Sequence, residues 1–266
     1  MQIRQKVPFV LASCEHGTVI LNRLDWRPLS ATHNEFGVGT DILINGNGDR
    51  DLLAILCGML ETRRDAGGPG VMALDCGANI GTYTLEFGRA MEGWGMVLAF
   101  EPQERIFYAL AGNIAINNLF NAKAFNRAVG RAPGTIDIPV VDYQIPGQFG
   151  GFQLKGDGSS IGQKTDERTP VEVISIDAMK LARVDLLKAD VEGMELDVLE
   201  GARETIERSR PYILAEHHIC GKQNLEIFLD SIGYENIALG FNLLAAPRGD
   251  ETFGKLRGYL AKRLAA

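Results

Sequence analysis

The sequence predicts an α/β fold with a mostly parallel sheet and helices on both of its faces. From residue 71 onward, short apolar segments alternate with segments whose apolar residues recur at helical spacing. Val71–Asp75 and Gly95–Phe100 are apolar at nearly every position, as expected for strands that are buried on both faces. Because alternating strands and helices require crossover connections, successive strands are expected to lie parallel in one sheet.

The first 69 residues predict one strand and one long helix. Residues 17–24 read as a strand, and residues 48–68 place leucines and Met59 on one face of a helix. Asp49 and Asp51 suit the start of this helix, and Gly67 suits its end. We expect residues 1–69 to form an extension that packs on the core of the protein.

The remaining residues predict one larger domain at 70–250 and a tail at 251–266. Strands are expected at 71–75, 95–102, 122–129, within 184–193, and at 212–218, 236–241 and 242–247. Helices are expected at 82–91, 103–118, 194–208 and 222–232, with a short basic helix in the tail. An insertion at 131–170 interrupts the alternation with extended segments and a glycine-rich run, which predicts a hairpin and a mobile loop.

Composition and charge limit the classes of function. The 266 residues are 45% apolar and 23% charged, which is typical of a globular protein with one large domain. The net charge of −7 argues against nucleic acid as a partner, and no apolar run is long enough to span a bilayer. The four cysteines form no Cys-x-x-Cys pair, which argues against zinc or a disulfide framework and favours reduced thiols in the cytoplasm.

A glycine turn follows the strand that ends at Asp75, in the order Asp75-Cys76-Gly77-Ala78-Asn79-Ile80-Gly81. Ligands of parallel sheets bind at the carboxyl ends of strands, where glycines let the backbone approach them. The Gly-x-Gly-x-x-Gly fingerprint of dinucleotide sites is not met, because Asn79 stands at its middle glycine. A carboxylate at Asp75 would repel a pyrophosphate but can accept hydrogen bonds from an ammonium group. The turn therefore favours a ligand that carries an amino acid.

A second carboxylate, Glu101, ends the next predicted strand 20 residues after Gly81. At this place a carboxylate can accept hydrogen bonds from both hydroxyl groups of a ribose. A nucleoside joined to an amino acid without phosphate is S-adenosylmethionine. The two strand ends together predict this cofactor.

Four segments resemble the FkbM-type S-adenosylmethionine-dependent methyltransferases: "LDCGANIGTYT", "AFEPQERIFYALAGNIAINN", "NRAVG" and "VDLLKADVEGMELDVLEGA". The likeness covers residues 70–245. It implies a Rossmann-like seven-stranded sheet with an antiparallel last strand, and O-methylation of hydroxyl groups on sugars or natural products. The expected acceptor is thus a small molecule, and the sequence leaves the oligomeric state open.

The resemblance also implies roles for single residues. Asp75, Gly77, Asn79 and Gly81 would hold the methionine part of the cofactor. Glu101 would hold the ribose, and the adenine would lie near two residues after the third strand, Asn126 and Ala128. Asp190, after the fourth strand, would border the methyl group.

Two clusters offer a general base for an acceptor hydroxyl. "KADVEGME" contains Asp190 and Glu192, and "LAEHH" ends the next strand with Glu216, His217 and His218. Alternation along a strand places Glu216 and His218 on one side and His217 on the other. We favour His217 or Asp190 as the base. Magnesium or calcium on the carboxylates is an alternative, but no metal motif of fixed spacing is present, and no metal is expected.

The sequence therefore predicts an S-adenosylmethionine-dependent methyltransferase that methylates a hydroxyl group. N-methylation and a nucleoside-binding module without catalysis are the alternatives. The insertion at 131–170 is the candidate lid, in which Tyr143, Phe149 and Phe152 are placed to cover an organic acceptor.

Overall fold

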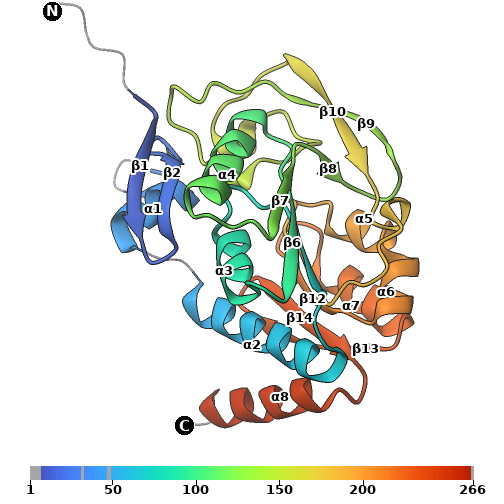
Figure 1. The fold of residues 1–266 in the computed structure, drawn as a ribbon. Coiled ribbons are helices and arrows are strands. Elements are labelled where there is room, and N and C mark those ends of the chain that lie inside the picture. The colour runs from blue at the N-terminus through green and yellow to red at the C-terminus, as the bar shows by residue number, and fades with distance from the viewer. Residues whose placement is uncertain (1–6, 31–32, 47–48, 265–266) are drawn as a thin grey trace, which may run out of the picture.

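The computed structural model describes residues 7–30, 33–46 and 49–264, with side chains in the last helix described to residue 260. Its centre is a seven-stranded sheet in the order β13-β14-β12-β11-β5-β6-β7 (Figure 1). The strands are β5 (Val71–Cys76), β6 (Gly95–Phe100), β7 (Ala122–Phe125), β11 (Leu186–Ala189), β12 (Tyr212–Glu216), β13 (Tyr234–Leu239) and β14 (Asn242–Pro247). β14 alone runs in the direction opposite to the other six strands, which confirms the predicted mostly parallel sheet with an antiparallel last strand.

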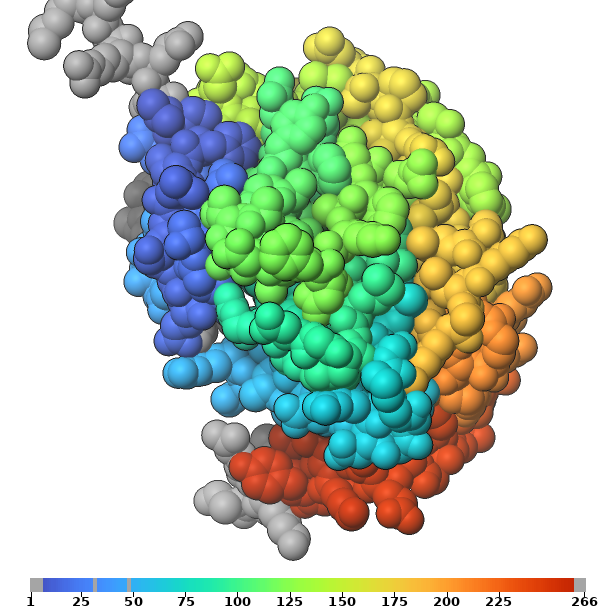
Figure 2. Space-filling model, in the orientation of Figure 1, coloured from blue at the N-terminus to red at the C-terminus, as the bar shows by residue number. Residues whose placement is uncertain are grey.

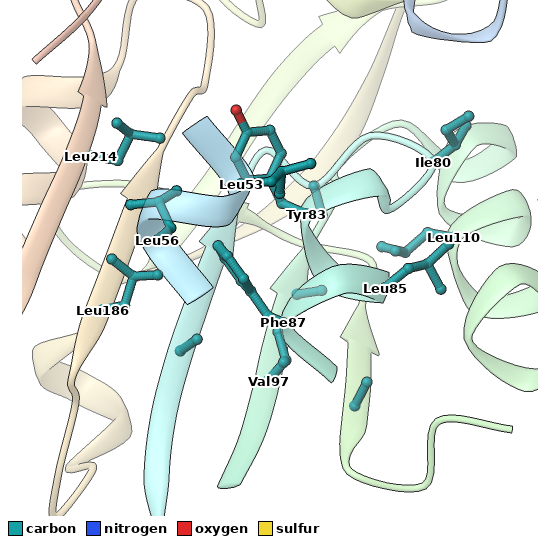
Figure 3. Close-up of a cluster of buried hydrophobic side chains, with 14 of the residues drawn as sticks. Leu53, Leu56, Ile80, Tyr83, Leu85, Phe87, Val97, Leu110, Leu186 and Leu214 are labelled. Atoms are coloured by element: carbon teal, nitrogen blue, oxygen red, sulfur yellow. The ribbon is translucent and has the colours of Figure 1, made fainter. Parts of the chain in front are cut away.

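Seven helices follow the N-terminal segment: α2 (Arg50–Gly67), α3 (Thr82–Ala90), α4 (Glu104–Ile116), α5 (Glu195–Glu200), α6 (Arg203–Ser209), α7 (Lys222–Ser231) and α8 (Glu251–Leu264). Alternate strand residues face different cores, because successive side chains point to opposite faces of a sheet. Ala73 belongs to the core that contains α2 and α3, and Leu74 belongs to the core that contains α5, α6 and α7. In Figure 3, side chains of α2 and α3 gather against strand residues Leu186 and Leu214.

Two predicted elements are divided in the structure. The third strand stops at Phe125, and Ala128–Val129 form a separate strand, β8, that pairs in another sheet. The helix expected at 194–208 breaks between α5 and α6. The break follows from packing at Gly201, where a Cβ atom would lie 2.2 Å from the carbonyl oxygen of Gly130. The other predicted helices are present, with ends shifted by a few residues.

The N-terminal segment contains β1 (Phe9–Cys14), β2 (Gly17–Asn22), β3 (Trp26–Pro28), β4 (Asn34–Phe36) and α1 (Val38–Asn45). Its β2 strand lies against α4, as Figures 1 and 2 show. The Asn113 amide of α4 joins the two, because it accepts from the backbone N–H of Ile20 at 2.5 Å and donates to the carbonyl of Ile20 at 3.1 Å. The same amide donates to the carbonyl of Ile80 at 2.8 Å, so it also supports the glycine turn.

The insertion at 131–170 forms the predicted hairpin, and the mobility of its glycine-rich run stays a prediction. Its strands are β9 (Gly134–Pro139) and β10 (Arg168–Ile174), which make a three-stranded sheet with β8. Short 3-10 turns occur at Phe149–Gly151, Ser159–Ile161 and Asp177–Met179. Between the strands, Phe149, Phe152 and Ile161 are buried in the core that also holds α2 and α3. These apolar anchors fix the path of the glycine-rich run.

The tail forms α8 beside α2, with Phe253 buried in the same core (Figure 1). None of the helices in the described ranges has the length and apolar character needed to cross a membrane. Residue 48, at the start of the predicted long helix, and residues 265–266, at the end of the tail, lie outside the described residues. The division at residues 69 and 250 stays a prediction.

Candidate functional site

The glycine turn caps the ends of two adjacent parallel strands. After β5, the backbone N–H groups of Gly77 and Ala78 donate to the carbonyl oxygen of Phe100 at the end of β6, at 3.0 and 2.9 Å. Gly77, Asn79 and Gly81 all have positive φ angles, of 78°, 51° and 99°. Asn79 tolerates this conformation, since its side-chain oxygen accepts from the next backbone N–H at 2.7 Å.

Close packing of the backbone also requires a glycine at position 77, in addition to the ligand approach expected from the sequence. A Cβ atom at this position would lie 1.7 Å from the carbonyl oxygen of Asp190, which follows β11. The turn after β5 and the segment after β11 therefore meet backbone to backbone. This close approach brings the candidate cofactor turn next to the candidate catalytic segment.

Two adjoining cavities open at these strand ends. The first cavity, of about 220 Å³, runs from Glu101 and Ala128 to Asp190 and Glu192. The second cavity, of about 280 Å³, lies between the start of α1 and the turn at 77–79. Neither volume reaches the ~300–1,000 Å³ of usual small-molecule sites. The two share lining residues, however, namely Val38, Gly77, Asn79, Gln148 and Asp190. Together they can take an elongated ligand.

The structure brings six of the ten predicted site residues to the first cavity: Gly77, Asn79, Glu101, Ala128, Asp190 and Glu192. The other four, Asp75, Gly81, Asn126 and His217, line neither cavity. Gly81 lies against Leu110 of α4, and the Asn126 amide donates to the carbonyl oxygens of Glu101 and Pro102 at 2.9 and 3.0 Å. These two residues support the walls of the site from outside.

Asp75 is fully buried beneath the turn, and its Oδ1 makes no hydrogen bond within the described part of the chain, although a cation lies beside it. Thr84 Oγ1 donates to Oδ2 at 2.6 Å, and the Lys188 ammonium lies 3.2 Å from Oδ1. The predicted contact of Asp75 with the cofactor stays untested; in the structure its carboxylate contacts Lys188, which lines the second cavity.

Lys188 is a residue of the candidate site that the sequence motifs did not predict. Only 4% of its side chain is exposed, and its ammonium lies 3.2 Å from both Asp75 Oδ1 and Asp190 Oδ2. It also donates to the carbonyl of Gly77 at 3.2 Å and lies over the Tyr83 ring. Burial lowers the pKa of this ammonium, but the carboxylates of Asp190 and Asp75 outweigh burial, so its pKa is raised above the ordinary value. A lysine inside the apolar strand "LLKAD" was the available signal, because buried lysines are rare unless paired.

Glu101 is positioned as an acceptor at one end of the first cavity. Its Oε2 accepts from the backbone N–H of Asn79 at 3.0 Å, and Oε1 accepts from that of Gln103 at 2.9 Å. Burial raises the pKa of this carboxyl to about 7, although both N–H groups act to lower it. Each oxygen keeps a further lone pair, so the carboxylate can also accept from hydroxyl groups of a ligand.

Acidic side chains gather at the other end of the first cavity. Burial first, and then the charge of Asp190, raises the pKa of Glu192 to about 8 and that of Glu216 to about 9. His218 Nδ1 lies 3.1 Å from Glu216 Oε2, which agrees with the predicted shared side of the strand. One ligand atom each from Glu192, Glu216 and His218 lie within 4.8 Å of one another, so this set can hold a divalent cation.

His217 directly follows β12 and lines neither cavity. Its Nε2 is buried and makes no hydrogen bond within the described part of the chain, and its backbone N–H donates to Phe241 at 2.8 Å. The role of His217 as a base stays an untested prediction. The geometry favours Asp190 and Glu192, which line the first cavity.

The insertion contributes one wall of the site. Gln148, Gly150, Phe152 and Leu154 line the first cavity, whereas Phe149 and Tyr143 pack outside it. Gln103 links the insertion to Glu101, because its side-chain amide donates to the carbonyl oxygen of Phe149 at 3.0 Å while its own N–H binds Glu101. Of the three aromatic residues expected to cover an acceptor, only Phe152 reaches a cavity.

The chain is similar to known methyltransferases. Methyltransferase 1 of Beauveria bassiana (strain ARSEF 2860) is 28% identical over 145 residues, which are 48% of this chain and 57% of that protein. Methyltransferase sdnD of Sordaria araneosa is 28% identical over 156 residues, which are 49% of this chain and 60% of that protein. The chain thus matches less than two thirds of the length of either relative.

Among solved structures, the methyltransferase FkbM of Methylobacillus flagellatus KT is 16% identical, with a TM-score of 0.48 over 66% of this chain and 43% of that one. The family model described as the methyltransferase FkbM domain matches residues 75–263, which include the glycine turn, Glu101 and the acidic cluster. The chain belongs to the FkbM methyltransferase family.

Proposed function

We propose that this protein transfers a methyl group from S-adenosylmethionine to a hydroxyl group of a small molecule such as a sugar or natural product. Membership of the methyltransferase family supports the reaction class. The observation that carries the proposal is the first cavity, which has a buried carboxylate at one end and an acidic cluster at the other.

The residues of the first cavity suit this cofactor. Phe100, Val129 and Phe152 offer apolar surface for an adenine, and the Glu101 carboxylate offers acceptors for ribose hydroxyls. Asp190 would face the positively charged sulfonium and ammonium groups. When bound, S-adenosylmethionine supplies an activated methyl group, so the protein needs chiefly to align the acceptor and exclude water.

The cavities are poorly suited to a pyrophosphate. Of the described residues that line the two cavities, only Arg127 and Lys188 are basic. Arg127 pairs with Glu172 at 3.0 Å, and Lys188 is held between two aspartates. Both basic side chains of the described lining are thus engaged with carboxylates, which supports a cofactor without phosphate.

We assign proton transfer to Glu192 and orientation of the acceptor to Asp190. A general base works best when its pKa lies near the working pH, and burial raises the pKa of Glu192 to about 8. Asp190 is fixed by Lys188 at 3.2 Å, so its second oxygen can orient the acceptor by accepting from a neighbouring hydroxyl of the same molecule, while Glu192 takes the proton of the reacting hydroxyl. The acidic cluster would also attract an amine, which makes N-methylation the second candidate.

The test is a screen of hydroxylated and amine-bearing small molecules with a labelled methyl donor, followed by mass analysis of the products. We expect a hydroxyl compound to gain the label. With that acceptor, Glu192→Gln should lower kcat by about 10²–10⁴-fold, the usual contribution of a general base, while cofactor affinity stays close to wild type. Labelling of amines alone would reject O-methylation. Cofactor binding without any transfer would leave the nucleoside-binding module as the function.

A further inference from the structure

Asp25 is a buried carboxylate between two segments that border the cavities. It lies between β2 and β3, and 3% of its surface is exposed. Its Oδ2 accepts from the backbone N–H of Gly39 at 2.8 Å, and its Oδ1 accepts from that of Phe149 at 2.7 Å. Gly39 belongs to the first turn of α1, and Phe149 belongs to the insertion more than 100 residues later. One side chain thus joins the N-terminal segment to the insertion.

The segments that Asp25 joins carry the residues shared by both cavities. Val38 precedes Gly39, Gln148 precedes Phe149, and both Val38 and Gln148 line the first and the second cavity. Gly150, on the other side of Phe149, also lines the first cavity. The separation between these two walls therefore depends on the hydrogen bonds made by Asp25.

The surroundings of Asp25 are built tightly around its carboxylate. A Cβ atom at Gly37 would lie 2.0 Å from Asp25 Oδ1, although Gly37 has a φ of −86° that any residue can adopt. The backbone N–H of Gly37 donates to the Asp25 carbonyl at 2.8 Å. No basic side chain pairs with Asp25 in the described part of the chain. Burial raises its pKa to about 6, opposed by N–H groups of Gly39, Phe149 and Gly150.

A buried carboxylate without a cation is costly, and a chain that only needed to pack would place an apolar residue there. We propose that Asp25 is a positioning residue that holds the start of α1 and residues 148–150 at a fixed separation and so shapes the cavities for the cofactor. Asp25 touches neither ligand nor reacting atoms. The inference rests on the proposed function, because it concerns the cofactor of that site.

Two substitutions perturb this contact in different ways. Asp25→Asn keeps the shape of the side chain but leaves one oxygen to serve the N–H groups of both segments. Gly37→Ala leaves residue 25 an aspartate, but the added methyl group displaces its carboxylate. Glu61→Gln, which removes an exposed carboxylate from α2, and Gly58→Ala, whose added Cβ meets open space, are the matched controls.

The first measurement is titration calorimetry with S-adenosylhomocysteine. We expect wild type and both controls to bind alike, and Asp25→Asn and Gly37→Ala to bind about tenfold more weakly, the effect of one lost hydrogen bond to a charged group. With an acceptor in hand, the KM for the cofactor should rise more than kcat falls. Wild-type binding with unchanged affinity in both variants would overturn the inference. Failure of the wild type to bind would instead reject the proposed function.

The second measurement is hydrogen exchange of the protein without ligand. We expect the amides of Gly39 and Phe149 to be protected in wild type, and the peptide 147–152 to exchange faster in both variants while β5 and β11 stay unchanged. Rapid exchange of these amides in wild type would overturn the inference even if neither variant folds. Faster exchange throughout the variants would show a purely structural role and would also overturn it.

Discussion

Removal of the buried ammonium at Lys188 should strongly destabilise the fold. Lys188→Met leaves Asp75, which is fully buried, and Asp190 without the cation that lies 3.2 Å from each. Removing one partner of a buried ion pair costs about 3–5 kcal/mol, because the remaining charge is uncompensated. Lys188 is only 3% exposed, so solvent screens these pairs little. We therefore expect the free energy of unfolding to fall by an amount within that range.

Urea unfolding at pH 7.5, followed by circular dichroism, measures this loss. The double substitution Lys188→Met with Asp75→Asn removes the stranded charge as well and should recover a substantial part of the stability. Lys123→Met, at an exposed position of β7, is the control and should stay within about 0.5 kcal/mol of wild type. A loss below about 1 kcal/mol for Lys188→Met, or no recovery in the double variant, would refute the reasoning, because a buried charge would then be tolerated.

Three further outcomes are expected. Burial raises the pKa of Glu101 to about 7 and that of Glu192 to about 8, above the ordinary 4.5, so the stability that these protonated carboxyls contribute is lost as pH rises through those values. The free energy of unfolding of the unliganded protein should therefore increase from pH 8.5 to pH 6. In urea titrations, the double variant Glu101→Gln with Glu192→Gln should show a flatter dependence on pH. Gly77→Ala should abolish cofactor binding or folding, since its Cβ would lie 1.7 Å from the Asp190 carbonyl oxygen. Gly93→Ala, with the same φ of 78° but open space around it, should lower the free energy of unfolding by only about 1–2 kcal/mol. Equal effects of the two substitutions in thermal melts would contradict the packing argument. Methyl transfer should survive dialysis against a chelator, because Lys188 already supplies a cation beside Asp190. Loss of activity that magnesium restores would instead assign a metal to the acidic cluster.

The sequence predicts the sheet well because its signals are local. Apolar strands buried on both faces, such as β5 and β6, and helices with a clear apolar face, such as α2, are found at their expected places. The break at Gly201 depends on a carbonyl group 71 residues earlier in the chain, and such a contact has no local signature.

The sequence predicts residues of the site only where they directly follow a strand, because the end of the strand determines their position. Glu101 follows β6 and Asp190 follows β11, the two strands that flank β5, so topology places both residues at the same end of the sheet. Asp25 and Lys188 act through partners distant in sequence, and the wall at residues 148–154 depends on how the insertion folds back. The roles of the site residues and the cytoplasmic location stay predictions.

The central claim is that the first cavity receives a nucleoside that carries a sulfonium and no phosphate. Titration calorimetry of the purified protein with S-adenosylmethionine and with NAD, on wild type and Glu101→Gln, tests it most directly. We predict one binding site for S-adenosylmethionine, a clear loss of affinity in Glu101→Gln, and no heat with NAD. Binding of NAD, or binding of S-adenosylmethionine that Glu101→Gln leaves unchanged, would contradict the claim.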